Sequence, residues 1–228
     1  MTIELYDTWW NDPSEDEQRM EDSHAPHWKK IIDAILERDL TASSVLDFGC
    51  NQGGFLGFLH RERPFAYGLG VDLARRSVEI ANERKAGLPV DYVVATTLAA
   101  YAGRFDLATS SAVIYLIGDL ADHARQMRQA LKAGGVYYAT YTDYRGNPSL
   151  TAIRAEIDRY GAVPMQLHAL DDIALAFQDE GFSVSARRLG VTDYVPLRLP
   201  DRFFRCVTDR MQYEYEQAYI FRFVAPSA

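Results

Sequence analysis

The sequence predicts a three-layer, doubly wound α/β fold, in which helices cover both faces of a mostly parallel sheet. Two observations predict it. Residues 45–55 have the pattern of a buried strand, a tight turn of small residues and the start of a helix. Beyond them, apolar runs of strand length alternate with stretches of helical periodicity, which is typical of repeated strand–helix–strand units.

Composition and charge limit the kind of function. The 228 residues, 48% hydrophobic and 25% charged, are enough for one large domain with a single core. Asp and Glu outnumber Lys and Arg by 32 to 24 without any basic block, so the electrostatic pattern of a nucleic-acid-binding protein is missing. We expect a cytoplasmic protein with a small-molecule substrate and no membrane span, because no signal peptide and no apolar run near 18 residues occurs.

The two cysteines, Cys50 and Cys206, have neither disulfide nor metal-ligand spacing, so we expect free thiols and no metal site.

We divide the chain into an N-terminal segment, residues 1–26, and a domain over 27–228 with an insertion at about 190–216. The first segment carries Tyr6 and two consecutive tryptophans, Trp9 and Trp10. Such large rings must pack against another part of the protein. Ser23 is expected to cap the next helix, whose apolar stripe is Trp28, Ile31, Ile32, Ile35 and Leu36. In its first turn, His24 and His27 fit either a surface position or substrate contact.

The remaining elements follow from periodicity and from glycine or proline breaks. Strands are expected at about 45–48, 65–71, 90–95, 105–111, 136–141, 182–189 and 217–224. Helices are expected at 54–63, 74–85, 119–132, 150–160 and 171–180. The interval 190–216 is too long for a hairpin turn, so we expect either substrate-site closure or a dimer contact there.

The turn after the first strand is the strongest candidate for a binding site. Such a turn places backbone N–H groups and a positive helix end beside the strand's carboxyl edge, and Gly49 and Gly53 remove Cβ atoms that block close approach. Its spacing is not G-x-G-x-x-G, which disfavours a nicotinamide or flavin cofactor. Asp72 follows about 20 residues later at a strand end, the separation at which a carboxylate accepts ribose hydroxyls.

The Asp-x-Gly-Cys-x-x-Gly stretch at 47–53 resembles motif I of the class I (Rossmann-like) S-adenosylmethionine (SAM) dependent methyltransferases of the small-molecule type, with Asn51 replacing the commonest residue, glycine. Residues 104–115 resemble motif IV of that family, and the Leu-Lys-Ala-Gly-Gly lead-in at 131–135 is another of its features. The resemblance covers residues 27–224. It implies a seven-stranded sheet with an antiparallel C-terminal hairpin and SAM lying across the carboxyl ends of strands one, two and four.

The resemblance also implies site residues. The expected cofactor contacts are Asp47, Gly49, Cys50, Asn51, Gly53, Asp72, Leu73, Thr96, Ser110 and Ser111. The N-terminal segment is expected either to fold over the cofactor as a lid or only to anchor the terminus. For a hydroxyl acceptor, Asp143, His24 or His27 are candidate bases, and Tyr115 or Tyr141 are candidates to orient the acceptor.

Three functions fit these observations. The favoured one is SAM-dependent methyl transfer to a small, biosynthetic acceptor by a monomer or homodimer. One alternative resembles the azetidine-2-carboxylate synthases, in which the amino group of SAM attacks its own γ-carbon and methylthioadenosine leaves; a closed aromatic pocket without room for an acceptor would favour it. The other is a non-catalytic SAM-binding protein.

Overall fold

The computed structural model describes residues 5–12, 17–191 and 194–227. Within these ranges no helix is long and apolar enough to cross a membrane. The same ranges contain no group of three or more His, Cys, Asp or Glu side chains that could hold a metal ion.

A seven-stranded sheet forms the middle layer, with strand order β3-β2-β1-β4-β5-β7-β6. The strands are β1 (Leu40–Phe48), β2 (Phe65–Asp72), β3 (Val90–Val94), β4 (Phe105–Ser110), β5 (Leu131–Thr142), β6 (Ser183–Arg188) and β7 (Ala218–Val224). The first five pair in parallel, whereas β7 runs antiparallel to both β5 and β6. The predicted fold class is therefore confirmed. The strand order reverses between β1 and β4, the position where open α/β sheets bind ligands.

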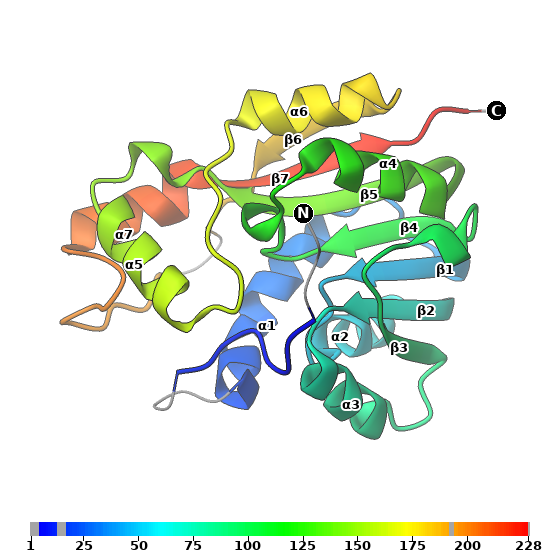
Figure 1. Cartoon of the computed structure of the whole chain (residues 1–228), viewed down its shortest axis with the longest axis horizontal. Helices are drawn as coiled ribbons and strands as arrows, with labels where there is room; N and C mark the ends of the chain where they lie inside the picture. Colours follow the sequence, from blue (N-terminus) through cyan, green and yellow to red (C-terminus); the bar gives the residue numbers. More distant parts are fainter. Residues whose placement is uncertain (1–4, 13–16, 192–193, 228) are drawn as a thin grey trace.

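Helices cover both faces of the sheet (Figure 1). They are α1 (Glu17–Ala34), α2 (Gly54–Glu62), α3 (Arg75–Arg84), α4 (Leu120–Ala130), α5 (Leu150–Tyr160), α6 (Leu170–Asp179) and α7 (Val207–Gln212). One core cluster joins the sheet to α1, α2 and α3, and the other joins it to α4 and α6. In Figure 1, α5 and α7 lie beyond the ends toward which the arrows of β1, β2 and β4 point. These two helices therefore border the edge where the binding site is expected.

Both ends of α1 differ from the sequence prediction. The helix expected to start at Ser23 begins at Glu17, so the expected cap is wrong and the expected boundary at residue 26 falls inside α1. Leu36 lies past the end of α1 and is 59% exposed, so it does not belong to the core stripe.

The helix expected to continue to Lys132 ends at Ala130, because the chain becomes extended at Leu131 and pairs there with β4. Gly134, which follows the expected helix, lies within β5 at a positive φ of 73°. The pairing of β4 with β5 is irregular between Phe105 and Leu107, which accommodates this early start of the strand.

Candidate functional site

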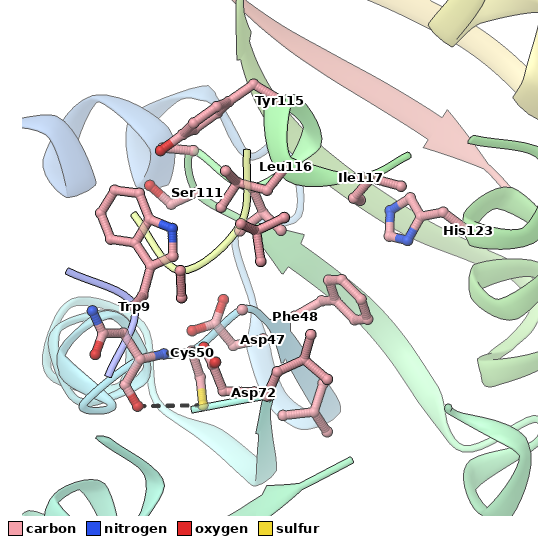
Figure 2. Close-up of a pocket in the computed structure, with 18 of the residues that line it drawn as sticks. Trp9, Asp47, Phe48, Cys50, Asp72, Ser111, Tyr115, Leu116, Ile117 and His123 are labelled. Atoms are coloured by element: carbon pink, nitrogen blue, oxygen red, sulfur yellow. Dashed lines mark hydrogen bonds between the residues drawn. The ribbon is translucent and has the colours of Figure 1, made fainter. Parts of the chain in front are cut away.

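A cavity of about 1370 Å³ lies at the carboxyl ends of β1, β2 and β4. Figure 2 shows Asp47, Cys50 and Asp72 on one side of it, Tyr115 on the opposite side and Trp9 between them. Further walls come from the first residues after β3, the start of α4 and the segment that follows α5. Parts of the chain that are distant in sequence therefore meet around one space.

The turn after β1 is held by bonds within the protein. The N–H groups of Gly49 and Cys50 both donate to the Val71 carbonyl, at 2.8 and 3.1 Å, and that of Gly53 donates to the Cys50 carbonyl at 2.8 Å. The turn was expected to present backbone donors to a ligand, but these three are already paired, two with the end of β2 and one within the turn. The turn thus fixes the shape of the site rather than forming an open anion cradle.

The two glycines of the turn serve packing. Gly53 has φ +82°, and a Cβ added there would lie 2.5 Å from the Tyr92 ring, whose hydroxyl donates to the Gly53 carbonyl at 2.9 Å. Gly49 has φ +78°, and its Cβ would overlap the Val113 side chain. Both glycines therefore admit a left-handed backbone and a neighbouring side chain, and their contact with a ligand stays a prediction.

Asp72 is oriented by two backbone donors. The Asn51 N–H reaches Oδ2 at 2.8 Å and the Ala74 N–H reaches Oδ1 at 2.9 Å. Asp72 lines the cavity, and a carboxylate is an acceptor suited to hydroxyl groups of a ligand. Asn51 Oδ1 is buried and accepts no hydrogen bond from the described part of the chain, which leaves an acceptor for a ligand N–H or O–H in the same wall.

Asp47 is a buried carboxylate whose Oδ1 accepts a hydrogen bond from Thr109 Oγ1 at 3.0 Å. Burial raises the pKa of Asp47 to about 7; the Thr109 bond opposes this rise and the charge of Asp72 adds to it. A cation in the cavity would stabilise the ionised form, since an opposite charge nearby favours ionisation. The site is therefore suited to a ligand that combines hydroxyl groups with positive charge.

Most of the residues predicted from the sequence line this cavity. They are Asp47, Gly49, Cys50, Asn51, Asp72, Leu73, Thr96, Ser111, Tyr115, His24 and His27. Gly53 and Ser110 do not line it: Gly53 packs on Tyr92, and the Ser110 hydroxyl forms a 2.6 Å hydrogen bond with the Tyr137 hydroxyl in the core.

Two of the predicted catalytic residues lie outside the cavity wall. Asp143 forms hydrogen bonds of 2.8 Å with Arg145, which hold the pKa of its carboxyl below its usual value. The Tyr141 hydroxyl donates to the His168 carbonyl at 2.6 Å, and burial raises its pKa to about 12. Contact of either side chain with an acceptor is therefore not supported, because each points to a protein partner instead.

Tyr115, the candidate to orient the acceptor, and the candidate bases His24 and His27 line the cavity, and burial determines the protonation of each. Burial raises the pKa of Tyr115 far above its usual value, so its hydroxyl keeps its proton and acts as a donor. Burial likewise lowers the pKa of His27 to about 4 and lowers that of His24. Both imidazoles are thus neutral at physiological pH and are weak bases.

His168 is a cavity residue that the sequence did not indicate. Its Nε2 lies 2.7 Å from the Ile117 carbonyl, which only accepts, so we assign the proton to Nε2. In the neutral ring, Nδ1 is then the acceptor. The Gln166 N–H also donates to the Tyr115 carbonyl at 2.7 Å, so two bonds fix this segment on the short helix Ile114–Leu116 and the residue after it.

His123 is a second cavity residue missed by sequence reasoning. It packs on Phe48, with ring centroids 4.8 Å apart, and its Nε2 lies 3.0 Å from the Tyr137 hydroxyl. Burial lowers the pKa of His123 to about 3, so the ring is neutral. No local pattern signals either histidine, because each gains its role from partners in other elements.

Residues 5–12, here called the strap, cross this edge of the sheet. Tyr6 and Trp9 line the cavity, whereas Trp10 is buried on Tyr160. Residues 1–4 and 13–16 of the expected lid lie outside the described residues. Of the 190–216 connection, no residue that the structure describes lines the cavity, so direct closure of the site by that connection is not supported.

Comparison with protein families gives one match that covers most of the chain. The family profile described as "Methyltransferase domain" matches residues 20–186. The ubiquinone biosynthesis O-methyltransferase of Cereibacter sphaeroides is 30% identical over 140 residues, which are 56% of this chain and 56% of that protein. The enzyme of the same name from Escherichia coli is 28% identical over 117 residues, 50% and 49% of the two chains. The chain thus spans about half the length of the curated relatives it matches.

Solved structures share the fold at low sequence identity. A complex of the Haloferax volcanii Trm112 methyltransferase activator with a methyltransferase matches with a TM-score of 0.78 and 18% identity, covering 92% of this chain and 93% of that one. A SAM-dependent methyltransferase of Mesorhizobium loti matches with a TM-score of 0.65 and 18% identity, covering 89% of this chain and 99% of that one. Geranyl diphosphate methyltransferase, solved in complex with GPP and sinefungin, matches with a TM-score of 0.68 and 16% identity, covering 98% of this chain and 89% of that one.

Proposed function

The chain belongs to this methyltransferase-domain family, and we propose that it transfers the methyl group of SAM to a hydroxyl of a small-molecule acceptor. SAM is the cofactor of this family and fold. The residues present fit it: Asp72 is a carboxylate in the cavity wall suited to ribose hydroxyls, and Asn51 offers an unsatisfied buried oxygen. Asp47 supplies a buried carboxylate for a cationic ligand.

The observation that carries the proposal is the size of the cavity. Small-ligand sites typically occupy about 300–1,000 Å³. The cavity here, at about 1370 Å³, exceeds that range and extends from Asp72 to Tyr115 and His168. An acceptor therefore has room beside the cofactor. The cyclisation of SAM itself loses support for the same reason, because it was expected to accompany a pocket without such room.

SAM supplies an activated methyl group on a sulfonium, so the protein mainly has to hold the acceptor oxygen in line with it. Tyr115 keeps its proton and is suited to donate a hydrogen bond to that oxygen. His168 is suited to accept the acceptor's proton at Nδ1, because Nε2 is occupied by Ile117. The names of the curated relatives, all O-methyltransferases, support a hydroxyl acceptor.

The experiment that tests the proposal is mass spectrometry of the purified protein with SAM, alone and with a pooled small-metabolite extract. S-adenosylhomocysteine that forms only with extract is the expected result, accompanied by an acceptor that gains one methyl group. Methylthioadenosine from SAM alone would replace the proposal with cyclisation. Bound SAM without either product, across extracts from several growth conditions, would instead favour a non-catalytic binding protein.

A further inference from the structure

Arg202 joins three segments that are distant in sequence. Its Nε and Nη2 donate to Glu156 Oε2 in α5 at 2.8 and 2.6 Å, and its Nη1 donates to Asp12 Oδ2 at the end of the strap. Arg202 itself belongs to the 190–216 connection. The Asp12 side chain is only 2% exposed, so its charge is taken out of water and the guanidinium compensates it.

Aromatic rings surround the same guanidinium. Its carbon lies 5.0 Å from the ring centre of Tyr160, 5.4 Å from that of Phe203 and 5.8 Å from that of Trp10. Trp10 in turn packs on Tyr160 with ring centres 5.6 Å apart. Arg202 therefore holds the strap by charge and by cation–π contact together, which a lysine reproduces poorly because it lacks the planar fork.

The strap leads from this cluster directly to the cofactor side of the cavity. The Tyr6 N–H donates to the Leu73 carbonyl at 3.3 Å, and the Arg75 N–H donates to the Tyr6 carbonyl at 2.8 Å. Leu73 follows Asp72, the carboxylate assigned to the ribose. On the other side, the Ala162 N–H donates to the Trp9 carbonyl at 2.9 Å. A displaced strap would therefore remove Tyr6 and Trp9 from the wall and loosen the surroundings of Asp72.

We propose that Arg202 is a positioning residue, which holds the strap closed against the cavity and thereby sets the affinity for the cofactor. This inference rests on the proposed function, because the ligand of the cavity is taken to be SAM. The 190–216 connection then acts on the site without lining it. If Arg202 is removed, the buried Asp12 carboxylate loses the charge of the guanidinium, which makes the closed position of the strap less favourable.

The position of the strap can be measured without any substrate. The chain has three tryptophans, so a Trp28→Phe background leaves Trp9 and Trp10, both in the strap, as the only indole fluorophores. In that background, Arg202→Met is expected to increase acrylamide quenching of the emission and to shift it to longer wavelength. Arg202→Lys is expected to give an intermediate value, since the charge remains and the fork is lost.

Affinity is measured by calorimetry with S-adenosylhomocysteine, the product form of the cofactor. We expect Arg202→Met to weaken binding about tenfold, because the apparent dissociation constant rises as the fraction of competent protein falls. Arg205→Met is the matched control. Arg205 lies in the same connection, but its Nε donates to Asp209 within that connection, so its loss does not release the strap.

Unchanged quenching in Arg202→Met, or equal effects of Arg202→Met and Arg205→Met on affinity, would overturn the inference. If Arg202→Met does not fold, Asp12→Asn removes the opposite charge of the same pair, and increased quenching is again the expected result and unchanged quenching the contrary one. If the wild-type protein binds neither SAM nor S-adenosylhomocysteine, the proposed function fails, while the quenching experiment still decides whether Arg202 holds the strap.

Discussion

The two sides of the cavity are held together by different forces. On the cofactor side, the turn after β1 is fixed by backbone bonds to the end of β2, as in the pair from Gly49 and Cys50 to Val71. On the acceptor side, side chains help to fix the segment after α5, as in the bonds of His168 to Ile117 and of Tyr141 to the His168 carbonyl. The strap borders both sides and is held by backbone bonds and by Arg202. The bond from Arg202 to Asp12 spans 190 residues of sequence. The first side is therefore preformed by the sheet, and the second depends on contacts that single substitutions can remove.

This difference has a consequence for function. Backbone bonds between neighbouring strands persist when surface side chains change, so the cofactor side can stay constant. The acceptor side is built from segments outside the sheet, where the chain can vary without disturbing the turn. Methyl transfer fits such a division, because the donor is always the same and the acceptor differs between enzymes.

The largest effect is expected from Gly53→Ala. A Cβ at this position combines strain at φ +82° with a contact of 2.5 Å to the Tyr92 ring. We expect a loss of about 3 kcal/mol or more in the free energy of unfolding, measured by urea titration. Gly87→Ala is the matched control, since it has φ +80° but no atom within 4 Å of the added Cβ. It should lose only about 1 kcal/mol from strain. Equal losses would contradict the packing role of Gly53.

The second-largest effect is expected from a change of the Asp72 carboxylate, which is assigned to the ribose hydroxyls. Asp72→Asn keeps one acceptor oxygen for the backbone donors but removes the charge that strengthens bonds to ligand hydroxyls. S-adenosylhomocysteine binding should weaken about thirtyfold, which corresponds to about 2 kcal/mol. Asp106→Asn removes a carboxylate that pairs with Lys132 outside the cavity wall, and should leave affinity unchanged. Unchanged affinity in Asp72→Asn, by calorimetry, refutes the ribose assignment.

We expect the affinity for SAM to depend on pH, because burial raises the pKa of Asp47 to about 7. The cationic ligand favours the ionised carboxylate, so SAM affinity should rise about tenfold between pH 6 and pH 8 and binding at pH 6 should release a proton. Calorimetry in buffers of different ionisation enthalpy measures that proton. Asp47→Asn should abolish both effects, and a proton release that persists in this variant would assign it elsewhere.

Without a ligand, the raised pKa of Asp47 has the opposite effect on stability: SAM affinity rises with pH, whereas the stability of the folded protein falls. The folded-state pKa of Asp47 lies above the ordinary value of an aspartate, so the folded state binds the proton more tightly than the unfolded chain. Its contribution to stability is present at low pH and is lost as the pH rises toward 7. The cavity therefore carries an unfavourable charge at neutral pH, and a cation that binds there relieves it.

Sequence reasoning reached the cofactor side because its signals are local. Asp47, the turn and Asp72 lie within one strand–turn–helix–strand unit, where spacing along the chain determines position in space. The same reasoning did not predict which side chain lies beside Gly53. A glycine pattern shows that the backbone is left-handed, but not which side chain occupies the space beside it, and Tyr92 comes from β3.

The acceptor side was not predictable in this way. His168 enters the wall because Ile117 and Tyr141, from two other elements, hold its ring and its carbonyl. Asp143 was expected in the site from its place at the end of β5, yet the neighbouring Arg145 binds its carboxylate. Arg202 has no distinguishing pattern in the 190–216 interval, and its partners Asp12 and Glu156 lie far away in the sequence. Each of these outcomes depends on tertiary contacts, which periodicity and spacing do not encode.

The smallest effect tests whether the two sides are independent. Tyr141→Phe removes the hydroxyl that donates to the His168 carbonyl at 2.6 Å, and should lower the free energy of unfolding by about 1 kcal/mol. Affinity for S-adenosylhomocysteine should stay within about twofold of wild type, because no bond of the turn after β1 is touched.

Tyr138→Phe is the control for this prediction. Its hydroxyl bonds Glu37 and the Leu36 N–H outside the cavity wall, so it should cost a similar amount of stability without affecting either side. If Tyr141→Phe weakens cofactor binding as strongly as Asp72→Asn, the segment after α5 is coupled to the turn. The acceptor side would then take part in cofactor binding, and substrate and cofactor would bind with mutual dependence.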